Sequence, residues 1–422
     1  MRPPPLIENE LNEMKHKISH QDQSPLRDQP LPYKVWGASG IDAGALDQMN
    51  DAMRLPITAS GALMPDAHIG YGLPIGGVLA TYDSVIPYAV GVDISCMMRM
   101  SVFEPNPDVL DKSPTPYVKA LQDKTYFGAG QTNPTHPDHR VLEAHDWDDT
   151  KFLRGLRQDG ANQIGTSGSG NHFAEWGELE LTESDTGIDL PPGRYLALLS
   201  HSGSRAVGFK IANQYSKLAM ERHGNLPPGV RQLGWLSLTC DDGREYWRAM
   251  QLAGCFASAN HELIHRDVAA AAGLTPLAVV ENKHNLAWME DILTADGVEI
   301  EAIVHRKGAT PAAQGVLGII PGSMGDPGHV VRGKGNQSSL NSAAHGAGRA
   351  MGRRQATKSI SATERDAYLA RHRVTLLGGG LDESPQAYKR IEEVMAAQTD
   401  LVDVLGTFTP RIVKMANERG VD

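Results

Sequence analysis

Residues 72–96 read GLPIGGVLATYDSVIPYAVGVDISC, a run of small and β-branched apolar residues broken by glycines. The part from 72 to 92 predicts strands joined by glycine turns. The run ends on two polar side chains three positions apart, Asp93 and Cys96. The stretch therefore predicts a sheet in which the end of one strand carries chemically active groups.

Helical and strand-like patterns both occur along the rest of the chain. Helices are predicted at 41–55, 244–272, 364–373 and 384–398. Strands are predicted at 195–201, 277–285 and 301–308. Residues 130–160 are typical of an exposed loop with a short helix, and 183–194 of a turn-rich break.

No internal repeat, low-complexity tract or linker follows residue 35. We therefore predict one large α+β domain over residues 33–422, with mixed and antiparallel sheets surrounded by helices. A polar, proline-rich lead-in over residues 1–32 precedes this domain.

Composition excludes several classes of protein. The 422 residues are 41% hydrophobic and 21% charged, with no apolar run of membrane-spanning length and no secretory signal at the N-terminus. Cys96, Cys240 and Cys255 lie far apart, which favours a reducing cytoplasm over a disulfide framework. The net charge of −10 argues against a generally basic nucleic-acid coat, although it permits a local basic site. Sixteen histidines favour a search for metal or proton chemistry.

Polar side chains of metal-binding type end several apolar runs. Besides VGVDISC (90–96), these are GTSGSGNHF (165–173), LLSHSGSR (198–205) and ENKHNLAW (281–288). Each histidine taken alone is more often structural, but their shared position at strand ends favours a common site. The candidate ligands are Asp93, Cys96, His172, His201 and His284. Sulfur, imidazole and carboxylate together suit one or two ions of Mn, Zn, Fe or Co, and the residues do not choose among these.

Features suited to anions accompany these ligands. IIPGSMGDPGHVVRGKG (319–335) is glycine-rich enough for its amides to cradle phosphate. HRKGATP supplies Arg306 and Lys307, and Arg205 adds a further guanidinium. The stretch NSAAHGAGRAMGRRQA (341–356) is interpreted as a helix, in which His345 and Arg349 share one face. Many of the other side chains on this helix are small, so a bulky anion could come close to that face. Each of these features has a structural alternative. His345 could be a core histidine, the glycine-rich segment could form ordinary turns, and Arg353, Arg354 and Lys358 could lie on a solvated helix face.

Nine short motifs follow one another in a fixed order between residues 64 and 389. They are MPDAHIGYGLPIGG, GVDISC, GSGNHFAE, HSGSR, HN, RKGAT, PGSMG, HGAGR and LDESPQAYK. With these motifs the chain resembles the RtcB family of RNA-splicing ligases, from about residue 33 to near the C-terminus. The resemblance implies an α+β fold around a central metal and nucleotide cleft.

The resemblance also implies a reaction, used in RNA repair or tRNA splicing. RtcB ligases use GTP and Mn²⁺ to join RNA 2′,3′-cyclic phosphate or 3′-phosphate ends to 5′-hydroxyl ends. His345 matches the histidine that becomes linked to GMP, and Arg349 would balance phosphate charge. Asp93, Cys96, His172, His201 and His284 match the metal ligands, for one or two ions. The matching nucleotide contacts are Asn171, Glu175 (to guanine), Arg205, Asn285, Pro321, Gly322, Ser323, Met324, Gly325 and Tyr388.

The resemblance implies partners too. They are RNA with the ends just described and an archease-type activator. We expect a cytoplasmic monomer or weak oligomer with no membrane association.

Departures from the family pattern fall mainly on base recognition. Gly328 stands where a guanine-contacting serine is expected, and RIVKMANERGVD lacks the family's terminal Lys-Gly, with Lys414 out of register. Met97 replaces a glycine, and Asn260–His261 replaces Asn-Arg. We therefore expect discrimination between GTP and ATP to be weaker than in the family pattern.

Three functions remain open from the sequence. The first is the RNA ligase. The second is a divergent RtcB-type nucleotidyltransferase that caps RNA 3′ ends or acts as a phosphoesterase. The third is a non-catalytic RNA-binding protein, which would need neither the nucleophile nor the ligands.

Overall fold

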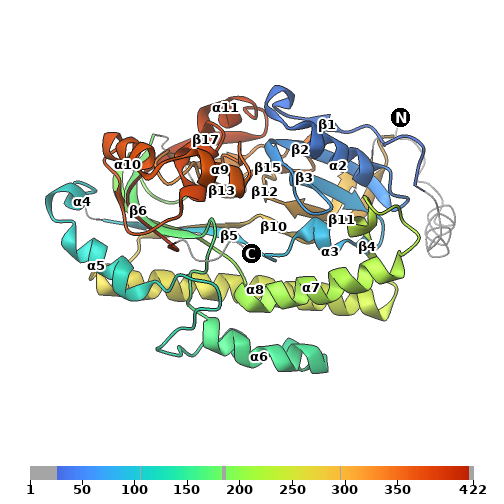
Figure 1. Cartoon of the computed structure of the whole chain (residues 1–422), viewed down its shortest axis with the longest axis horizontal. Helices are drawn as coiled ribbons and strands as arrows, with labels where there is room; N and C mark the ends of the chain where they lie inside the picture. The colour runs from blue at the N-terminus through green and yellow to red at the C-terminus, as the bar shows by residue number, and fades with distance from the viewer. Residues whose placement is uncertain (1–25, 105, 183–186, 295, 418–422) are drawn as a thin grey trace.

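The computed structural model describes residues 26–417 apart from 105, 183–186 and 295. An eight-stranded sheet lies at its centre (Figure 1). Its order is β13 (Leu317–Ile320), β14 (Gly328–Gly333), β17 (Val402–Met415), β6 (Phe173–Leu181), β7 (Gly193–Ser202), β5 (Met97–Phe103) and β9 (Ala278–Lys283), with β16 (Thr375–Leu376) beside β17. All neighbours are antiparallel except β16 and β17. The sheet therefore contains antiparallel pairs and one parallel pair, as predicted for a mixed sheet.

A five-stranded sheet lies beside the first. Its order is β1 (Lys34–Val35), β2 (Thr58–His68), β3 (Ile75–Thr81), β11 (Glu299–Lys307) and β10 (Asn285–Leu293). Two short pairs complete the strands: β12 (Ala309–Pro311) with β15 (Ser342–Ala344), and β4 (Ser84–Val85) with β8 (Leu236–Ser237).

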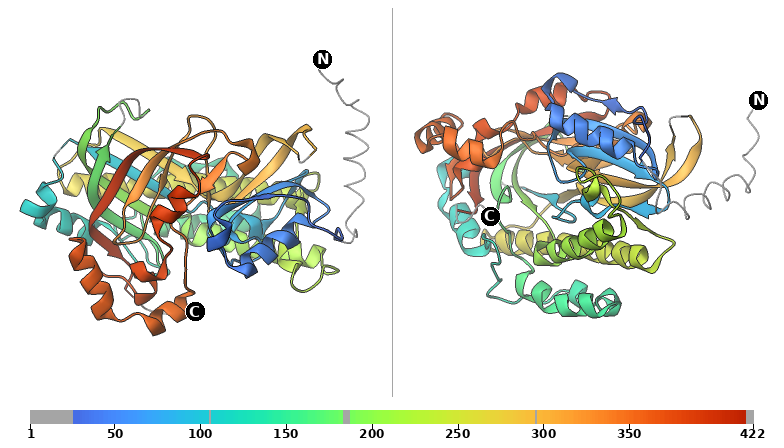
Figure 2. Two further views of the ribbon diagram at one scale, coloured as in Figure 1. Left: turned by 90° about the horizontal axis from the view of Figure 1, so that it is seen from above. Right: turned by 45° about the vertical axis from the view of Figure 1, so that its right-hand side comes forward.

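Helices cover the outside of the sheets. Two long ones, α7 (Arg205–Arg222) and α8 (Asp241–Ala271), lie side by side along one face, with α6 (Lys151–Gln163) beyond them (Figures 1 and 2). The others are α2 (Ala43–Met53), α3 (Pro87–Val90), α4 (Val109–Lys112), α5 (Thr115–Lys124), α9 (Arg353–Ser359), α10 (Ala362–Arg371) and α11 (Ile391–Ala396). Among the described residues, no helix is both long and apolar enough to cross a membrane.

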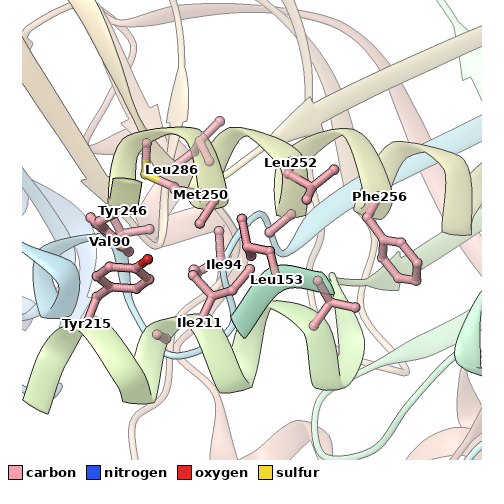
Figure 3. Close-up of a cluster of buried hydrophobic side chains, with 14 of the residues drawn as sticks. Val90, Ile94, Leu153, Ile211, Tyr215, Tyr246, Met250, Leu252, Phe256 and Leu286 are labelled. Carbon is pink, nitrogen blue, oxygen red and sulfur yellow. The ribbon is translucent and has the colours of Figure 1, made fainter. Parts of the chain in front are cut away.

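The largest apolar cluster lies between α7 and α8 (Figure 3). Tyr246, Met250 and Phe256 on α8 face Ile211 and Tyr215 on α7, and all five are buried. Burying each such side chain contributes about 1.5–3 kcal/mol to folding. The cluster also includes Leu286 and Ala287 of β10 and Ile303 of β11, so the two helices pack against the sheet that follows the His284 motif.

Three of the helices predicted from local patterns are confirmed, whereas the long helix α7 was not predicted. The predictions at 41–55, 244–272 and 364–373 are confirmed as α2, α8 and α10. Within 72–92, β3 and β4 confirm the strands, but 87–90 forms the short helix α3 behind Pro87. Only 391–396 of the helix predicted at 384–398 is α-helical, because 385–387 form a 3-10 turn.

The prediction of a helix at 341–356 is wrong. Residues 342–344 form β15, and α-helix begins only at Arg353. Between them, Gly348 takes a φ of +70°, which an α-helix cannot contain. His345 and Arg349 therefore do not share a helix face.

The lead-in predicted at 1–32 lies largely outside the described residues. Its last part, from residue 26, packs on the end of α2, where the Arg27 amide donates to the Arg54 carbonyl at 2.8 Å. Leu26 and Leu31 join the apolar cluster under α2.

Candidate active site

A cavity of about 640 Å³ is lined by residues of both large sheets and of the glycine-rich loops, in the position expected for a central cleft. Most of the residues predicted for the site line it: Asp93, Cys96, Asn171, Glu175, His201, His284, Asn285, Pro321, Gly322, Ser323, Met324, His345, Arg349 and Tyr388. His172, Arg205 and Gly325 are not part of the lining. The tertiary structure thus brings together motifs spread over nearly 300 positions of the chain.

Four of the five predicted metal ligands form a buried cluster around one sulfur atom. Cys96 Sγ lies 3.3 Å from His172 Nε2 and 3.0 Å from His201 Nε2, and His201 Nε2 lies 3.1 Å from His284 Nε2. The fifth, Asp93, places Oδ2 2.9 Å from His172 Nε2. The ligand-type atoms of Cys96, His172 and His201 all lie within 4.8 Å of one another, close enough for one ion.

The donor set of this cluster fits a divalent transition metal. Burial lowers the pKa of His201 to about 3 and that of His284 well below its ordinary value, so both rings are neutral, as metal ligands must be. The His201 Nδ1 proton is donated to the Asn171 carbonyl at 3.0 Å, which leaves the Nε2 lone pair facing Cys96. Burial by itself would raise the pKa of Asp93, but the hydrogen bond and charge of His172 lower it to about 2.

The predicted nucleophile is held by an acid that the sequence analysis did not identify. His345 Nδ1 lies 2.6 Å from Asp66 Oδ2, and the His345 amide donates to the same oxygen at 3.0 Å. Asp66 is fully buried at the end of β2. It belongs to the motif MPDAHIGYGLPIGG, which was the only signal that could have pointed to it. Because Nδ1 donates to Asp66, the His345 Nε2 lone pair is free on the cavity side, with the His284 ring 5.0 Å away between centroids.

Arg349 has other partners than the sequence suggested. Its guanidinium donates to the carbonyls of Met351 and Asp382, at 3.0 and 2.6 Å, and to Glu383 at 3.4 Å. It also lies over the Tyr388 ring, 5.2 Å from the centroid. Arg349 thus lines the cavity wall with its charge shared with Glu383, instead of projecting from a helix beside His345.

The other basic residues divide into two groups. Arg205 Nη1 lies 3.3 Å from His172 Nδ1, directly behind the metal cluster. Arg353 lines the cavity and pairs with Asp382 and Glu383, so it is not on a purely solvated face. The prediction that Arg306 contacts an anion is wrong. Its side chain is buried, pairs with Glu290 and donates to Ser342.

Lys307, predicted with Arg306, does line the cavity. Its buried amine donates to the carbonyls of Tyr71 and Leu73, and burial lowers the pKa of Lys307 to about 7. Asn285 is similarly engaged, since its side chain donates to the Asp93 carbonyl and accepts from the Gly308 amide. Both residues tie the walls of the cavity together.

Two departures from the family pattern fall at or near the cavity. Gly328 lines the cavity and presents no hydroxyl there. Lys414 does not reach the cavity, because Nζ donates to the carbonyls of Leu121, Gln122 and Thr125 on the far face of β17. Met415, one residue on, lines the cavity instead. Lys414 therefore does not take the place of the family's terminal lysine at the cavity, as its register indicated.

Asn260–His261 and Met97 lie outside this cavity. Asn260 Oδ1 accepts from the amides of Gly165 and Thr166, at 2.7 and 3.1 Å. His261 Nδ1 lies 2.7 Å from Ser200 Oγ, beneath the strand that carries His201. The pair on α8 therefore supports the two segments that present histidines to the cluster.

Comparison with known proteins agrees with this geometry. A family model described as tRNA-splicing ligase RtcB matches residues 48–147 and 139–415. RNA-splicing ligase RtcB from Escherichia coli (strain K12) is 33% identical over 402 residues, covering 89% of this chain and 95% of that protein. RNA-splicing ligase RtcB from Mycobacterium tuberculosis is 33% identical over 413 residues, covering 83% and 95%. tRNA-splicing ligase RtcB from Nanoarchaeum equitans is 30% identical over 445 residues, covering 88% and 92%. This chain belongs to the RtcB family, as its ordered motifs indicated.

Proposed function

We propose that this protein is an RNA ligase that joins 3′-phosphate or 2′,3′-cyclic phosphate ends to 5′-hydroxyl ends, through a nucleotide linked to His345. The observation that carries the proposal is the contact between His345 Nδ1 and the buried Asp66 carboxylate at 2.6 Å. This contact fixes the tautomer that leaves Nε2 free to act as a nucleophile. A histidine with a merely structural role would need no such exposed lone pair in a cavity.

In the first step, His345 Nε2 attacks the α-phosphorus of a nucleoside triphosphate such as GTP. A nitrogen–phosphorus bond forms, the bond to the β-phosphate oxygen breaks, and pyrophosphate leaves with that electron pair. The proton stays on Nδ1, hydrogen-bonded to Asp66, and the negative charge of that carboxylate balances the positive charge that forms on the ring. Covalent catalysis thereby splits one difficult transfer into easier ones.

RNA takes part in the next two steps. An oxygen of the RNA 3′-phosphate attacks the same phosphorus, the nitrogen–phosphorus bond breaks, and the neutral ring is restored. The 5′-hydroxyl oxygen then attacks the 3′-phosphorus, loses its proton, and displaces the nucleoside monophosphate. A 2′,3′-cyclic end must first take up water to provide the 3′-phosphate.

Asp93, Cys96, His172, His201 and His284 would hold one or two Mn²⁺ ions next to His345. A bound divalent cation supplies positive charge that stabilises the charge building up on the transferred phosphate. The two glycines that follow the nucleophile, Gly346 and Gly348, leave the loop narrow enough for phosphate to approach.

Intact-mass spectrometry tests the proposal. The whole protein, incubated with Mn²⁺ and a nucleoside triphosphate before any RNA is added, should gain the mass of one nucleoside monophosphate on His345. The adduct should be acid-labile and stable in alkali. His345→Ala should lose the adduct, whereas the matched control His372→Ala, an exposed histidine at the end of α10, should keep it.

Labelled RNA then separates the remaining alternatives. Joined product supports the ligase, whereas 3′-capped RNA without joining supports the end-capping function. An adduct that persists in His345→Ala, or that maps to another residue, would refute the mechanism. His345→Ala should still join RNA supplied with a preformed activated 3′ end, because that step needs no nucleophilic histidine.

A further inference from the structure

His68 is a histidine of the cavity to which the proposed reaction assigns no role. It is the last residue of β2 and lines the cavity. The register of β2 against β3 shifts between Leu63 and His68, as it does at a bulge, and bulges re-aim side chains. Side chains two positions apart on a strand point to the same side, so His68 lies beside Asp66, which holds the nucleophile. The end of β2 therefore directs a second imidazole toward the space in which His345 acts.

The backbone fixes which nitrogen of His68 carries the proton. Nδ1 lies 3.1 Å from the carbonyl oxygen of Asp66. A carbonyl oxygen can only accept, so Nδ1 is the donor and Nε2 keeps a lone pair. Within the described part of the chain, Nε2 has no hydrogen-bond partner, and it is not sealed from solvent. Burial is the main reason that the pKa of His68 is lowered to about 4, so the ring is neutral at pH 7. His68 therefore presents a free proton acceptor to the cavity.

Outside the metal cluster, the acids and the amine of the lining are less suited to take up a proton beside the nucleophile. Asp326 accepts from two hydroxyls, Glu383 pairs with two arginines, and Asp42 caps α2. The amine of Lys307 donates to two carbonyls. Glu175 lies on β6, in the other large sheet. None of these groups is both free and attached to the strand that holds the nucleophile.

Exposed apolar side chains follow His68 at the mouth of the cavity. Ile69 is 56% exposed and Tyr71 is 62% exposed, and both line the cavity. The carbonyl of Tyr71 accepts from the buried amine of Lys307, which anchors this turn to the cavity wall. Unpaired RNA bases stack on exposed aromatic rings. The segment 68–71 thus offers a stacking surface next to a proton acceptor, and both are features that the 5′-hydroxyl end of an RNA strand can use.

We propose that the segment 68–71 receives the 5′-hydroxyl end of the RNA, with Tyr71 stacking on its first base and His68 Nε2 acting as the general base of the joining step. The inference rests on the proposed function, because it takes the joining step as given. Nε2 accepts the proton of the 5′-hydroxyl, and the oxygen uses the electron pair left by that proton to bond to the RNA 3′-phosphorus. The bond from this phosphorus to the bridging oxygen breaks, and the nucleoside monophosphate leaves with that electron pair. The Nδ1 proton stays on the Asp66 carbonyl throughout, and Nε2 then releases its proton to water.

The joining step can be measured alone, with RNA whose 3′ end already carries the nucleotide and a separate 5′-hydroxyl strand. His68→Ala should join these strands about 100-fold more slowly than the unmodified protein, the size typical of a lost general base. Its rate of adduct formation on His345 should stay within about threefold of normal, because that step transfers no hydroxyl proton. The matched control is His145→Ala, which removes an exposed histidine outside the cavity lining and should change neither rate.

Three further measurements separate proton transfer from positioning. His68→Gln keeps an oxygen that can accept a hydrogen bond but takes up no proton, so it should join nearly as slowly as His68→Ala. Added imidazole should speed joining by His68→Ala about tenfold, because a free base can enter the space that the ring has left, and it should not speed the unmodified protein. Tyr71→Ala should raise KM for the 5′-hydroxyl strand about tenfold with little change in kcat, since it removes one stacking contact.

The inference is overturned by joining at the normal rate in His68→Ala, by recovery of the rate in His68→Gln, or by the absence of any gain from imidazole. Slow joining in His345→Ala together with normal joining in His68→Ala would assign the proton to the nucleophile instead. If His68→Ala does not fold, the rate of His68→Gln and the KM of Tyr71→Ala still decide the question. Failure of the proposed function would show differently, as the absence of both the His345 adduct and joined RNA with the unmodified protein.

Discussion

Asp66→Asn is the sharpest test of how the nucleophile is prepared. Asp66 Oδ2 accepts from His345 Nδ1 at 2.6 Å and from the His345 amide at 3.0 Å. Asparagine keeps nearly the same shape but has one acceptor oxygen and one donor nitrogen. With its oxygen in the place of Oδ2, the asparagine can accept both hydrogen bonds, so the ring keeps its tautomer but loses the carboxylate charge beside it. The positive charge that forms on the ring in the proposed attack on phosphorus is then no longer balanced.

The size of the effect follows from the charge that is removed from the hydrogen bond to the ring. A hydrogen bond to a charged partner contributes about 1.5–3 kcal/mol, which corresponds to a factor of about 10–150 in rate. We expect Asp66→Asn to slow formation of the nucleotide adduct by that factor. Nucleotide affinity and metal content should change less than threefold, because Asp66 does not contact either predicted binding region.

Rapid-quench mixing followed by intact-mass spectrometry measures the rate of adduct formation at saturating nucleotide. Asp42→Asn is the matched control, since Asp42 lines the cavity but caps α2 through the Gly44 amide, away from His345. Thermal melting of both variants checks that the fold is retained. An Asp66→Asn protein that forms the adduct within twofold of the normal rate would show that the charge of Asp66 does not assist the nucleophile.

Other contacts give three further predictions. Cys96→Ala removes the sulfur that contacts two histidines, so it should lower the amount of bound Mn²⁺ measured by elemental analysis and abolish the adduct. The melting temperature should stay nearly unchanged. A normal metal content would refute the proposed site. Gly168→Ala should slow adduct formation, because a Cβ at this position would lie 2.2 Å from Arg205 Nη2 and displace the guanidinium from His172. An unchanged rate would show that the position of Arg205 does not matter for the reaction. Burial raises the pKa of Glu175 in the folded state. The free energy of unfolding should therefore fall as the pH rises from about 4.3, the ordinary pKa of Glu, toward the raised pKa. The fall is at most about 1.4 kcal/mol for each pH unit. Glu175→Gln should therefore stabilise the nucleotide-free protein more at pH 8 than at pH 5 in thermal melts, and an equal change at both would contradict the neutral carboxyl.

Much of the site could be predicted because its residues are chemically distinctive. Cysteine, histidine and aspartate at the ends of apolar runs indicated a shared metal site, and the structure brings all five into one set of contacts with Cys96, His172 and His201 at its centre. Periodicity located α2, α8 and α10, since each helix depends on residues three and four positions apart. These features are encoded locally, so a single sequence was sufficient for them.

Basic residues were predicted less well. An arginine beside a glycine turn looks like a phosphate contact in the sequence whether or not its side chain is already paired with an acid. No local pattern shows which acid that is. Arg306 proved to be buried against Glu290, 16 positions away on the next strand, and Arg349 against Glu383. The helix predicted at 341–356 failed for a related reason. Its glycines carry a turn that Asp66 stabilises through the His345 amide, and that bond overrides the weak helical propensity of the stretch.

The sequence by itself indicated the groups for which we propose the chemistry: the thiol of Cys96, the imidazoles around it, and the ring of His345. Only the tertiary structure decided how those atoms are oriented. Asp66 reaches His345 across 279 positions of chain because β2 ends beside the loop after β15. Met415 faces the cavity while Lys414 faces α5, because register fixes which of two neighbouring side chains points inward. Propensity acts over a few neighbouring residues, whereas tautomer, charge pairing and base selection depend on groups that meet only when the sheets are assembled.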